Sequence, residues 1–286
     1  MSVDSPPVRA HAHGRLLVCA TPIGNLDDVT VRVLDSLRDA DVLACEDTRH
    51  TRILLERHDI RAARLVSLHE HNERTRAPEL AGLVADGATV ALLSDAGTPL
   101  VSDPGFALVG ACLQEELAVE VLPGPSAVLT ALIASGLPVQ RWRFVGFLPR
   151  RRGELERLLL HASETTLAFE APRRLSATLA LLAELDPDRP VAVCRELTKL
   201  HEEIRRGGAG ELAAYYAEHA PRGEIVLGIG AASADATDAA GREAALEALH
   251  ELVRAGAHPR RAAGTVARLT GLATNELYRE LARGEQ

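Results

Sequence analysis

The sequence has few cysteines and no long apolar segment, and each shortage excludes a class of protein. Its four cysteines, Cys19, Cys45, Cys112 and Cys194, are far apart and form no C-x-x-C pair, which argues against a structural zinc site and a disulfide framework. Three of them lie in apolar runs, so buried thiols in a reducing cytosol are expected. No apolar run approaches the roughly 18 residues of a membrane span. Residues 1–15 lack the apolar core of a signal peptide. These absences predict a cytoplasmic protein without a membrane partner.

Positive charge is also in short supply. The chain has 32 Lys and Arg against 40 Asp and Glu, a net charge of −8, and Lys199 is its one lysine. No global basic field would attract nucleic acid, so any basic binding patch must be local. The chain also lacks G-x-G-x-x-G after its first predicted strand and lacks G-x-x-x-x-G-K-[ST] altogether. These absences exclude the usual dinucleotide loop and a Walker-type ATPase.

The composition is otherwise that of a globular protein. The 286 residues are 47% hydrophobic and 25% charged, which excludes disorder as the main state. At roughly 150 residues per domain, two domains are expected.

The first half of the chain predicts repeated βα units. Apolar runs predict strands over 16–20, 42–45, 65–68, 89–93 and 119–122. Helices are predicted over 28–39, after a cap at Asp47 or Thr48, over 73–85, from an Asp103 cap to about 116, and over 125–135. Units of this length imply a mainly parallel sheet with helices on its faces.

The second half predicts a different arrangement. Strands are expected over 165–170, 191–196, 203–206 and 224–229, with helices over 154–161, 174–184 and 211–219. The close spacing of the last strands suggests a mixed sheet. The small polar stretch 231–241 is interpreted as a linker, followed by helices over 243–255, 260–269 and 274–282.

These patterns divide the chain into four parts. The prediction is a flexible tail (1–14), an N-terminal α/β cofactor domain (15–137), a C-terminal α/β domain (138–232), and a linker with a helical accessory segment (233–286). The last two helices, with Thr270-Gly271-Leu272 as their turn, are typical of a helix-turn-helix.

Three glycine-bearing loops follow predicted strands of the first half. They are Thr21-Pro22-Ile23-Gly24-Asn25, Ser94-Asp95-Ala96-Gly97-Thr98-Pro99 and Leu122-Pro123-Gly124-Pro125-Ser126. In an open parallel sheet, ligands bind beyond the carboxyl ends of the strands. Each loop alone could be an ordinary βα turn, but the three together predict a polar small-molecule site.

Longer motifs resemble a known family. The segment LSDAGTPLVSDPG (93–105) is similar to the signature of the tetrapyrrole-methylase superfamily, in its branch of small-subunit ribosomal RNA methyltransferases. Other blocks agree in order, and the likeness covers nearly the whole chain: ATPIGNLDDVT (20–30), ACEDTRHT (44–51), SLHEHNE (67–73), LPGPSA (122–127), FVGFLPR (144–150), FEAPRRL (169–175), RELTKLHEE (195–203) and NELYREL (275–281).

The resemblance implies a fold, a reaction and partners. The fold would be two α/β domains of tetrapyrrole-methylase type with a cleft between them, plus the short C-terminal helical segment. The reaction would be 2′-O-methylation of a cytidine in the decoding region of 16S rRNA, with S-adenosyl-L-methionine as the cofactor. The small ribosomal subunit would be the partner, and a homodimer is expected.

The resemblance also assigns the cofactor site by motif. The implied cofactor-binding residues are Pro22, Gly24, Ser94, Asp95, Ala96, Gly97, Thr98, Pro123, Gly124, Pro125, Ser126, Phe169 and Glu170. Close relatives often have Tyr-Glu where this chain has Phe169-Glu170, so a hydroxyl contact there would be lost.

Methyl transfer from a sulfonium to a ribose hydroxyl requires an aligned oxygen and a group that takes its proton. The candidate bases are Glu46, Asp47, Glu70, Asp95 and Asp103, of which Glu46 or Asp95 is favoured as the catalytic residue. Capping is the competing interpretation for Asp47 and, more strongly, for Asp103, which precedes Pro104.

The segment around His69, His71 and Asn72 is interpreted as a substrate-contacting loop. A zinc site built with Glu70 and Glu73 is the less favoured interpretation, because no third clustered ligand is evident. No metal is therefore expected.

Two rival functions share these motifs. One is methylation of a tetrapyrrole carbon, which EDTRHT, HEHNE and the helical tail disfavour. The other is a ribosome-associated protein that holds S-adenosylmethionine without turnover, which the intact loops disfavour.

The run Arg150-Arg151-Arg152 is a candidate local anchor for RNA phosphates, which Arg173-Arg174 could extend. Replacing Arg150, Arg151 and Arg152 with alanine is expected to weaken RNA affinity and flatten its salt dependence. The reason is that fewer phosphate contacts form and fewer counterions are released on binding. A salt titration of RNA binding measures both effects, and unchanged binding would refute the patch.

Overall fold

The structure, a computed structural model, describes residues 14–284 and, except for 234–240, 243 and 283–284, their side chains. The predicted flexible tail lies outside the described residues apart from Gly14. The chain divides into two compact units. Unit 1 comprises Met1–Ala134, Cys194–Ile204 and Glu224–Val226, and unit 2 comprises Ser135–Val193, Arg205–Gly223 and Leu227–Gln286. The domain boundaries drawn from the sequence stay a prediction.

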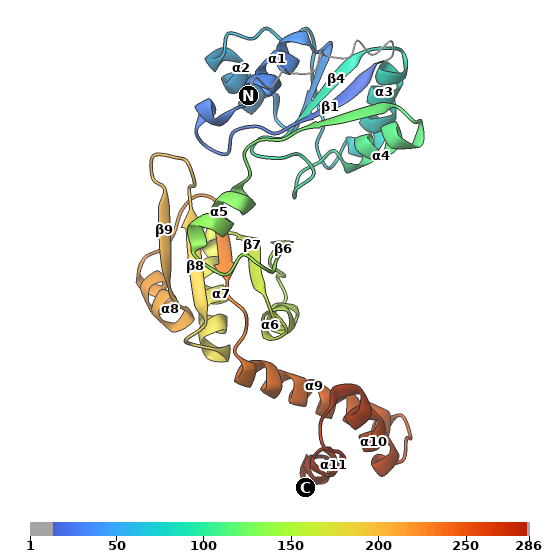
Figure 1. The fold of residues 1–286 in the computed structure, drawn as a ribbon, viewed down its shortest axis with the longest axis vertical. Coiled ribbons are helices and arrows are strands. Elements are labelled where there is room, and N and C mark those ends of the chain that lie inside the picture. The colour runs from blue at the N-terminus through green and yellow to red at the C-terminus, as the bar shows by residue number, and fades with distance from the viewer. Residues whose placement is uncertain (1–13, 285–286) are drawn as a thin grey trace, which may run out of the picture. The chain divides into compact units, whose positions relative to one another are not determined.

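Unit 1 contains a five-stranded sheet with helices on both faces (Figure 1). Its elements are β1 (Arg15–Cys19), η1 (Leu26–Asp28), α1 (Val31–Asp39), β2 (Val42–Cys45), α2 (Thr48–Arg57), β3 (Leu65–Ser67), α3 (Glu73–Ala85), β4 (Thr89–Leu93), α4 (Phe106–Gln114), β5 (Ala118–Leu122) and α5 (Ala127–Ser135). The strand order is β3-β2-β4-β1-β5, and each adjacent pair is parallel, as predicted.

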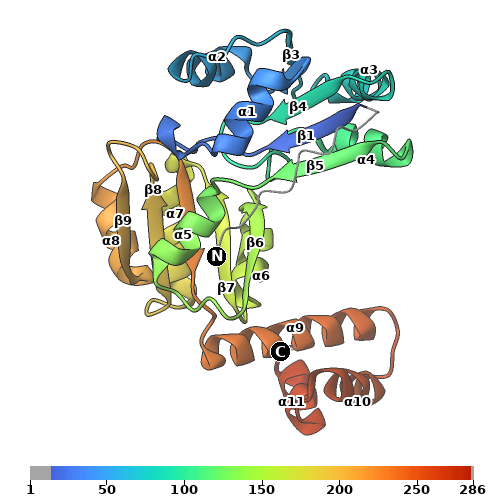
Figure 2. The ribbon, with the colours of Figure 1, turned by 45° about the horizontal axis from the view of Figure 1, so that its top comes forward.

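Side chains alternate between the two faces of this sheet, with the period of two that strands impose. Leu16, Val18 and Leu92 face a core closed by α3 and α4. Leu17 and Leu93 face the opposite core, which α1 and α2 close (Figure 2). Strands buried on both faces read as continuous apolar runs, which is why the sequence showed them clearly.

The start of α4 differs from the prediction. Asp103 does not cap this helix, which begins at Phe106 after an N-cap at Gly105 with φ 126°. The Oε1 atom of Glu73, the first residue of α3, accepts the N–H groups of Gly105 at 2.9 Å and Ala107 at 2.7 Å. A carboxylate distant in the sequence therefore takes the capping role, and Asp103 is left for other contacts.

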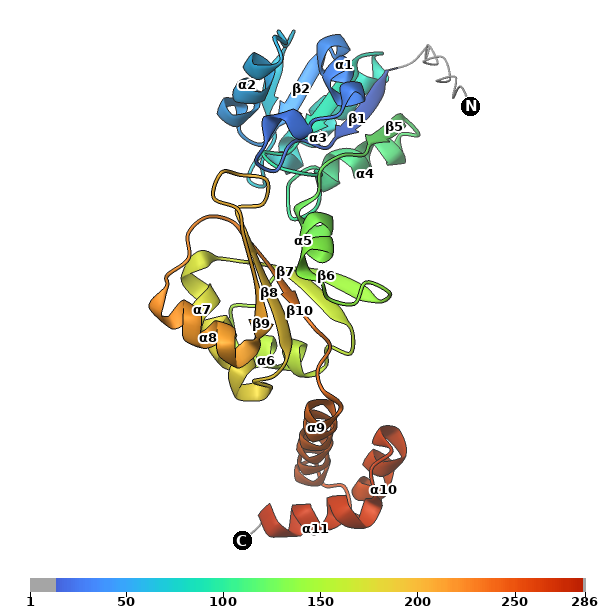
Figure 3. The ribbon, with the colours of Figure 1, turned by 60° about the vertical axis from the view of Figure 1, so that its left-hand side comes forward.

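Unit 2 contains a second five-stranded sheet, ordered β6-β7-β10-β8-β9. Its elements are β6 (Trp142–Phe147), α6 (Arg152–Leu160), β7 (Thr165–Glu170), α7 (Pro172–Leu185), β8 (Pro190–Arg195), β9 (Glu203–Gly208), α8 (Ala209–Glu218) and β10 (Ile225–Ile229). Helices α7 and α8 lie side by side (Figure 3). The sequence patterns missed β6, which pairs in parallel with β7 and has a register shift between Phe144 and Phe147.

The chain ends in three helices, α9 (Ala234–Arg254), α10 (Pro259–Thr270) and α11 (Thr274–Gly284). The prediction of a linker over 231–241 was wrong from Ala234 onward, because this alanine-rich stretch continues as helix. The predicted turn is confirmed: α10 ends at Thr270, and Gly271 caps it in the left-handed conformation with φ 77°. The three helices share a small core of their own that includes Leu249, Val266 and Leu277.

The four cysteines are free and buried, as expected for Cys19, Cys45 and Cys194; the burial of Cys112 was not predicted. Burial raises the pKa of the Cys19 thiol to about 12. Among the described residues, no helix is both long and apolar enough to cross a membrane.

The contact between Glu73 and α4 can be tested by stability. Glu73→Ala would leave two helix-end N–H groups without their acceptor and is expected to lower the free energy of unfolding by about 1–2 kcal/mol. Glu73→Gln keeps an acceptor oxygen and serves as the matched control, with a smaller expected loss. Urea unfolding measures both variants, and equal stability of Glu73→Ala and the unmodified chain would contradict the capping role.

Candidate active site

The three glycine-bearing loops follow three neighbouring strands. β1 lies between β4 and β5, and the ends of these strands are in register, with Cys19 opposite both Leu93 and Leu122. The loops that follow these three strands therefore all start side by side at the carboxyl-terminal edge of the sheet. This is the edge at which open parallel sheets bind ligands.

Main-chain hydrogen bonds join the first two loops. The Thr21 N–H donates to the Gly97 carbonyl at 2.8 Å, and the Gly97 N–H donates to the Thr21 carbonyl at 3.0 Å. The buried Thr21 hydroxyl also donates to the Ser94 carbonyl at 3.1 Å. Gly97 has φ +78°, a conformation that side chains rarely allow. These bonds fix the first loop against the second.

The third loop is held to the other two. The Ala20 N–H donates to the Leu122 carbonyl at 3.3 Å, and the Thr98 hydroxyl donates to the Pro125 carbonyl at 3.3 Å. A Cβ atom on Gly124 would lie 2.9 Å from the Ala20 Cβ, so glycine permits this close approach. Gly24, Gly97 and Gly124 therefore belong to one group of touching loops in unit 1. Of the residues predicted in these loops, Gly24, Pro123 and Gly124 are exposed, whereas Pro22 and Gly97 are buried.

A fourth loop, which the sequence interpretation did not assign, packs on the first. Residues 196–202 connect β8 to β9, and the Thr198 hydroxyl accepts the Asn25 N–H at 3.0 Å. A Cβ atom on Gly24 would lie 2.4 Å from the Lys199 Cγ and 2.9 Å from the Leu197 carbonyl oxygen. Glu196 and Thr198 have positive φ of 51° and 64°, a strained conformation of the kind that concentrates at functional sites. The motif RELTKLHEE was the signal for this loop.

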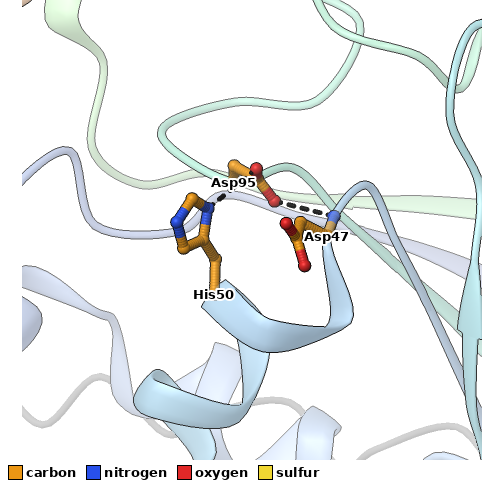
Figure 4. Close-up of side chains that lie close together, drawn as sticks. All are labelled: Asp47, His50 and Asp95. Carbon is orange, nitrogen blue, oxygen red and sulfur yellow. Dashed lines mark hydrogen bonds and ion pairs between the residues drawn. The ribbon is translucent and has the colours of Figure 1, made fainter.

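Asp95, from the second loop, is tied to the start of α2 (Figure 4). Its Oδ1 accepts the Asp47 N–H at 2.9 Å, and its Oδ2 pairs with the His50 Nδ1 at 2.9 Å. The Asp95 carboxylate raises the pKa of His50. Asp47 caps α2 as predicted, and its hydrogen bonds from Arg49 hold its pKa well below the usual range. His50 was missed as a site residue, although it lies one helical turn after Asp47.

Ligand atoms of Asp47, His50 and Asp95 lie within 4.8 Å of one another, a spacing that a metal ion could use. Both Asp95 oxygens already have partners, so hydrogen bonding accounts for the arrangement. The less favoured zinc interpretation around His69 gains no support from Glu73, whose carboxylate is bonded to α4.

Further carboxylates interact electrostatically with Asp95. Desolvation, followed by the negative charge of Glu46, raises the pKa of Asp103 to about 7, and Asp95 and Glu224 contribute to that shift. Desolvation and the charge of Asp95 also raise the pKa of Glu46. Glu46, Asp95, Asp103 and Glu224, here called the carboxylate cluster, therefore interact electrostatically; Glu224 contributes least and also pairs with Lys199 at 3.0 Å. A cluster of this kind can hold a proton near neutral pH.

The other predicted substrate residues of unit 1 lie in the turn between β3 and α3. The Asn72 side chain accepts the His69 N–H at 2.9 Å and donates to the Ser67 carbonyl at 3.1 Å, so it stabilises this turn. The rings of His69 and His71 are 6.0 Å apart. Their role toward a substrate stays a prediction.

The remaining predicted residues belong to unit 2. Arg151 pairs with Glu154 at 3.3 Å and Arg152 pairs with Glu184, so acids already neutralise two members of the arginine run. Glu170 is buried, with its carboxylate accepting the Thr178 hydroxyl at 2.6 Å and the Ala171 N–H at 2.8 Å. Phe169 packs against Phe144, with 5.0 Å between ring centroids.

The raised pKa of Asp103 predicts a specific pH dependence of stability. Between about pH 4 and pH 7 the folded chain keeps this proton while the unfolded chain loses it, so the group's contribution to stability falls as pH rises. The free energy of unfolding of the unmodified chain, relative to Asp103→Asn, should therefore rise as pH is lowered from about 8 to about 5.

Urea unfolding across this range measures the difference. Asp39→Asn, at the exposed end of α1, removes the same charge and serves as the control. Parallel stability curves for the unmodified chain and Asp103→Asn would contradict the shift.

The chain is similar to a known protein family and to named relatives. Residues 15–213 match the family Tetrapyrrole (Corrin/Porphyrin) Methylases. The chain is 46% identical over 271 residues to ribosomal RNA small subunit methyltransferase I of Mesorhizobium japonicum, covering 93% of this chain and 90% of the relative. It is 44% identical over 272 residues to the protein of the same name from Micromonospora olivasterospora, covering 94% and 86%.

Solved structures share the fold at lower identity. A uroporphyrin III C-methyl transferase from Thermus thermophilus, complexed with S-adenyl homocysteine, superposes with a TM-score of 0.55 at 20% identity, covering 76% of this chain and 97% of that one. The family match over most of the chain and the near full-length relatives lead to one conclusion: the chain belongs to the tetrapyrrole methylase family, among the ribosomal RNA small subunit methyltransferases I.

Proposed function

We propose that this protein transfers a methyl group from S-adenosylmethionine to the 2′-hydroxyl of a cytidine in 16S rRNA of the small ribosomal subunit. The observation that carries the proposal is the joining of the loops after β1, β4 and β5 at one edge of the sheet. Relatives named ribosomal RNA small subunit methyltransferase I, similar over more than nine tenths of the chain, support the choice of rRNA.

In this proposal the cofactor lies against the loops of unit 1. The exposed main chain at Gly24, Pro123 and Gly124 suits a ligand that is held by backbone groups, since no Cβ atom blocks either glycine. Ser94 to Thr98 of the second loop form one wall of the cofactor site. Pro125 and Ser126 extend the surface that Pro123 and Gly124 of the third loop provide. When bound, the cofactor supplies a sulfonium that carries the methyl group.

The chain's own residues must orient the ribose hydroxyl and take its proton. Of the two predicted catalytic residues, Glu46 is the better proton acceptor, because burial and the charge of Asp95 raise its pKa. Both oxygens of Asp95 are occupied by Asp47 and His50. Asp95 therefore acts by positioning the start of α2.

The remaining assignments are part of the same proposal. Phe169 and Glu170 of unit 2 stay predicted cofactor-binding residues. Arg150–Arg152 and, separately, His69, His71 and Asn72 are proposed to contact the RNA. We expect a cytoplasmic homodimer. Exposed Leu129 and Ile133 on α5, 49% and 79% accessible, support a partner surface of the same chain.

The activity is tested by offering the purified protein labelled S-adenosylmethionine with unmodified 30S subunits or with a precorrin. The proposal expects label in 16S rRNA, mapped to the 2′-oxygen of a single cytidine in the decoding region. Label in the tetrapyrrole alone, or none in either, would overturn it.

The loop site is tested with a pair of glycine variants. Gly124→Ala places a methyl group against Ala20 and is expected to weaken S-adenosylmethionine binding by about tenfold or more, since one loop must shift. Gly110→Ala is the control, because a Cβ atom there meets nothing within 4 Å. Calorimetric titration measures both, and equal affinities would argue against the site.

A further inference from the structure

The C-terminal helices carry a set of arginines that no part of the proposed active site uses. From Leu252 to Asn275 the chain has four arginines, Arg254, Arg260, Arg261 and Arg268, with His258 and without an Asp or Glu. The whole protein has a net charge of −8, so this is a local region of opposite sign.

The arginines of α10 lie on its exposed side. Ala262, Ala263 and Val266 are buried in the core shared with α9 and α11. Arg261, Thr265 and Arg268 follow one another at helical spacing on the opposite, exposed side, with Arg260 beside them. We call Arg260, Arg261 and Arg268, with His258, the α10 basic face.

These guanidinium groups are not neutralised within the described part of the chain. Among described side chains, no carboxylate forms an ion pair with Arg260, Arg261 or Arg268. The acids of α11 point elsewhere, because Glu276 and Glu280 both pair with Arg242 of α9. By contrast, Arg151 and Arg152 of the run in unit 2 are paired with Glu154 and Glu184.

The face also contains a hollow lined by basic side chains. His258, Arg260 and Arg261 line a hollow of about 420 Å³ at the start of α10. The His258 side chain makes no capping hydrogen bond to the helix, so the positive end of α10 adds to the charge of the hollow.

The length of the face favours a polyanion over a single ion. Arg261 and Arg268 are seven residues apart, about 10 Å along the helix axis, so one phosphate cannot contact both. A membrane surface fits poorly, because interfacial helices expose a broad apolar face and the apolar side of α10 is buried. A nucleic-acid backbone supplies phosphates at regular intervals.

We propose that the α10 basic face binds the phosphate backbone of the RNA substrate and supplies the main electrostatic anchor of the protein on it. This inference rests on the proposed function, which makes RNA the substrate. The contacts are to phosphates, so they strengthen binding without reading sequence.

The test uses the full-length protein in four forms: unmodified, R260A/R261A/R268A, R260K/R261K/R268K, and R32A/R38A/R61A. The last removes three exposed arginines of unit 1 and matches the charge change. Binding to a fluorescent hairpin of the unmodified decoding region is measured over a salt series, together with methyl transfer to 30S subunits. Vesicles of phosphatidylserine and phosphatidylcholine provide a competing anionic surface, and polyglutamate provides an acidic peptide.

The alanine triple variant is expected to bind RNA about tenfold or more weakly at low salt, with the slope of log K against log salt reduced by about 2–3. Its KM for 30S subunits should rise while kcat and S-adenosylmethionine affinity stay unchanged. The lysine variant should keep most of the affinity, because phosphate contacts need charge, and the unit 1 control should match the unmodified protein.

Three other results would overturn the inference. If the unmodified protein methylates rRNA and the alanine variant binds RNA with the same affinity and slope, the inference alone fails. Loss of binding to vesicles or polyglutamate without loss of RNA binding also contradicts it. If the unmodified protein neither binds nor methylates rRNA, the proposed function fails and this inference fails with it.

Discussion

Two main-chain hydrogen bonds between Thr21 and Gly97 hold the candidate site together. They join loops that follow β1 and β4, two strands that β2, β3 and their helices separate in the sequence but that are adjacent in the sheet. Gly97 accepts this geometry because its φ of +78° costs a glycine little. The third loop and the strained 196–202 loop then pack on this pair, so the shape of the whole group depends on it.

Much of the fold could be predicted from the sequence, because strands buried on both faces are continuous apolar runs. β1, β2 and β4 are such strands, whereas the helices were found from their caps and the spacing of their apolar residues. The start of α4 could not be predicted in this way. Local capping rules consider only nearby residues such as Asp103, whereas the acceptor that caps α4 is Glu73, about thirty residues earlier. The strand β6 was missed because Arg143 and Gly146 interrupt its apolar residues, so it lacks a continuous apolar run. The small residues after Gly230 were interpreted as a linker, although alanine also favours helix.

The site was predictable in its loops but not in its contacts. The glycine and proline motifs indicated which segments matter, and the parallel sheet placed them at one edge. The pairing of Asp95 with His50 depends on how α2 sits on the sheet, which no motif describes. The carboxylate cluster could not be predicted either. Glu224 belongs to unit 1 through the short segment Glu224–Val226, which the predicted boundaries place in the C-terminal domain.

The acidic and basic regions of the molecule have different proposed roles. A sulfonium carries positive charge, and the carboxylate cluster beside the loops suits it electrostatically, whereas the same negative charge repels an RNA backbone. An enzyme with this site and a net charge of −8 therefore needs a separate basic surface to hold its substrate. The α10 basic face, carried by helices with a core of their own, meets that requirement.

The central claim is that the loops after β1, β4 and β5 form one binding site for the methyl donor. A crystal structure determined with S-adenosylhomocysteine tests it most directly. The account predicts that the ligand contacts the main chain of the loops that contain Gly97 and Gly124. A ligand bound elsewhere, with both of these loops untouched, would contradict it.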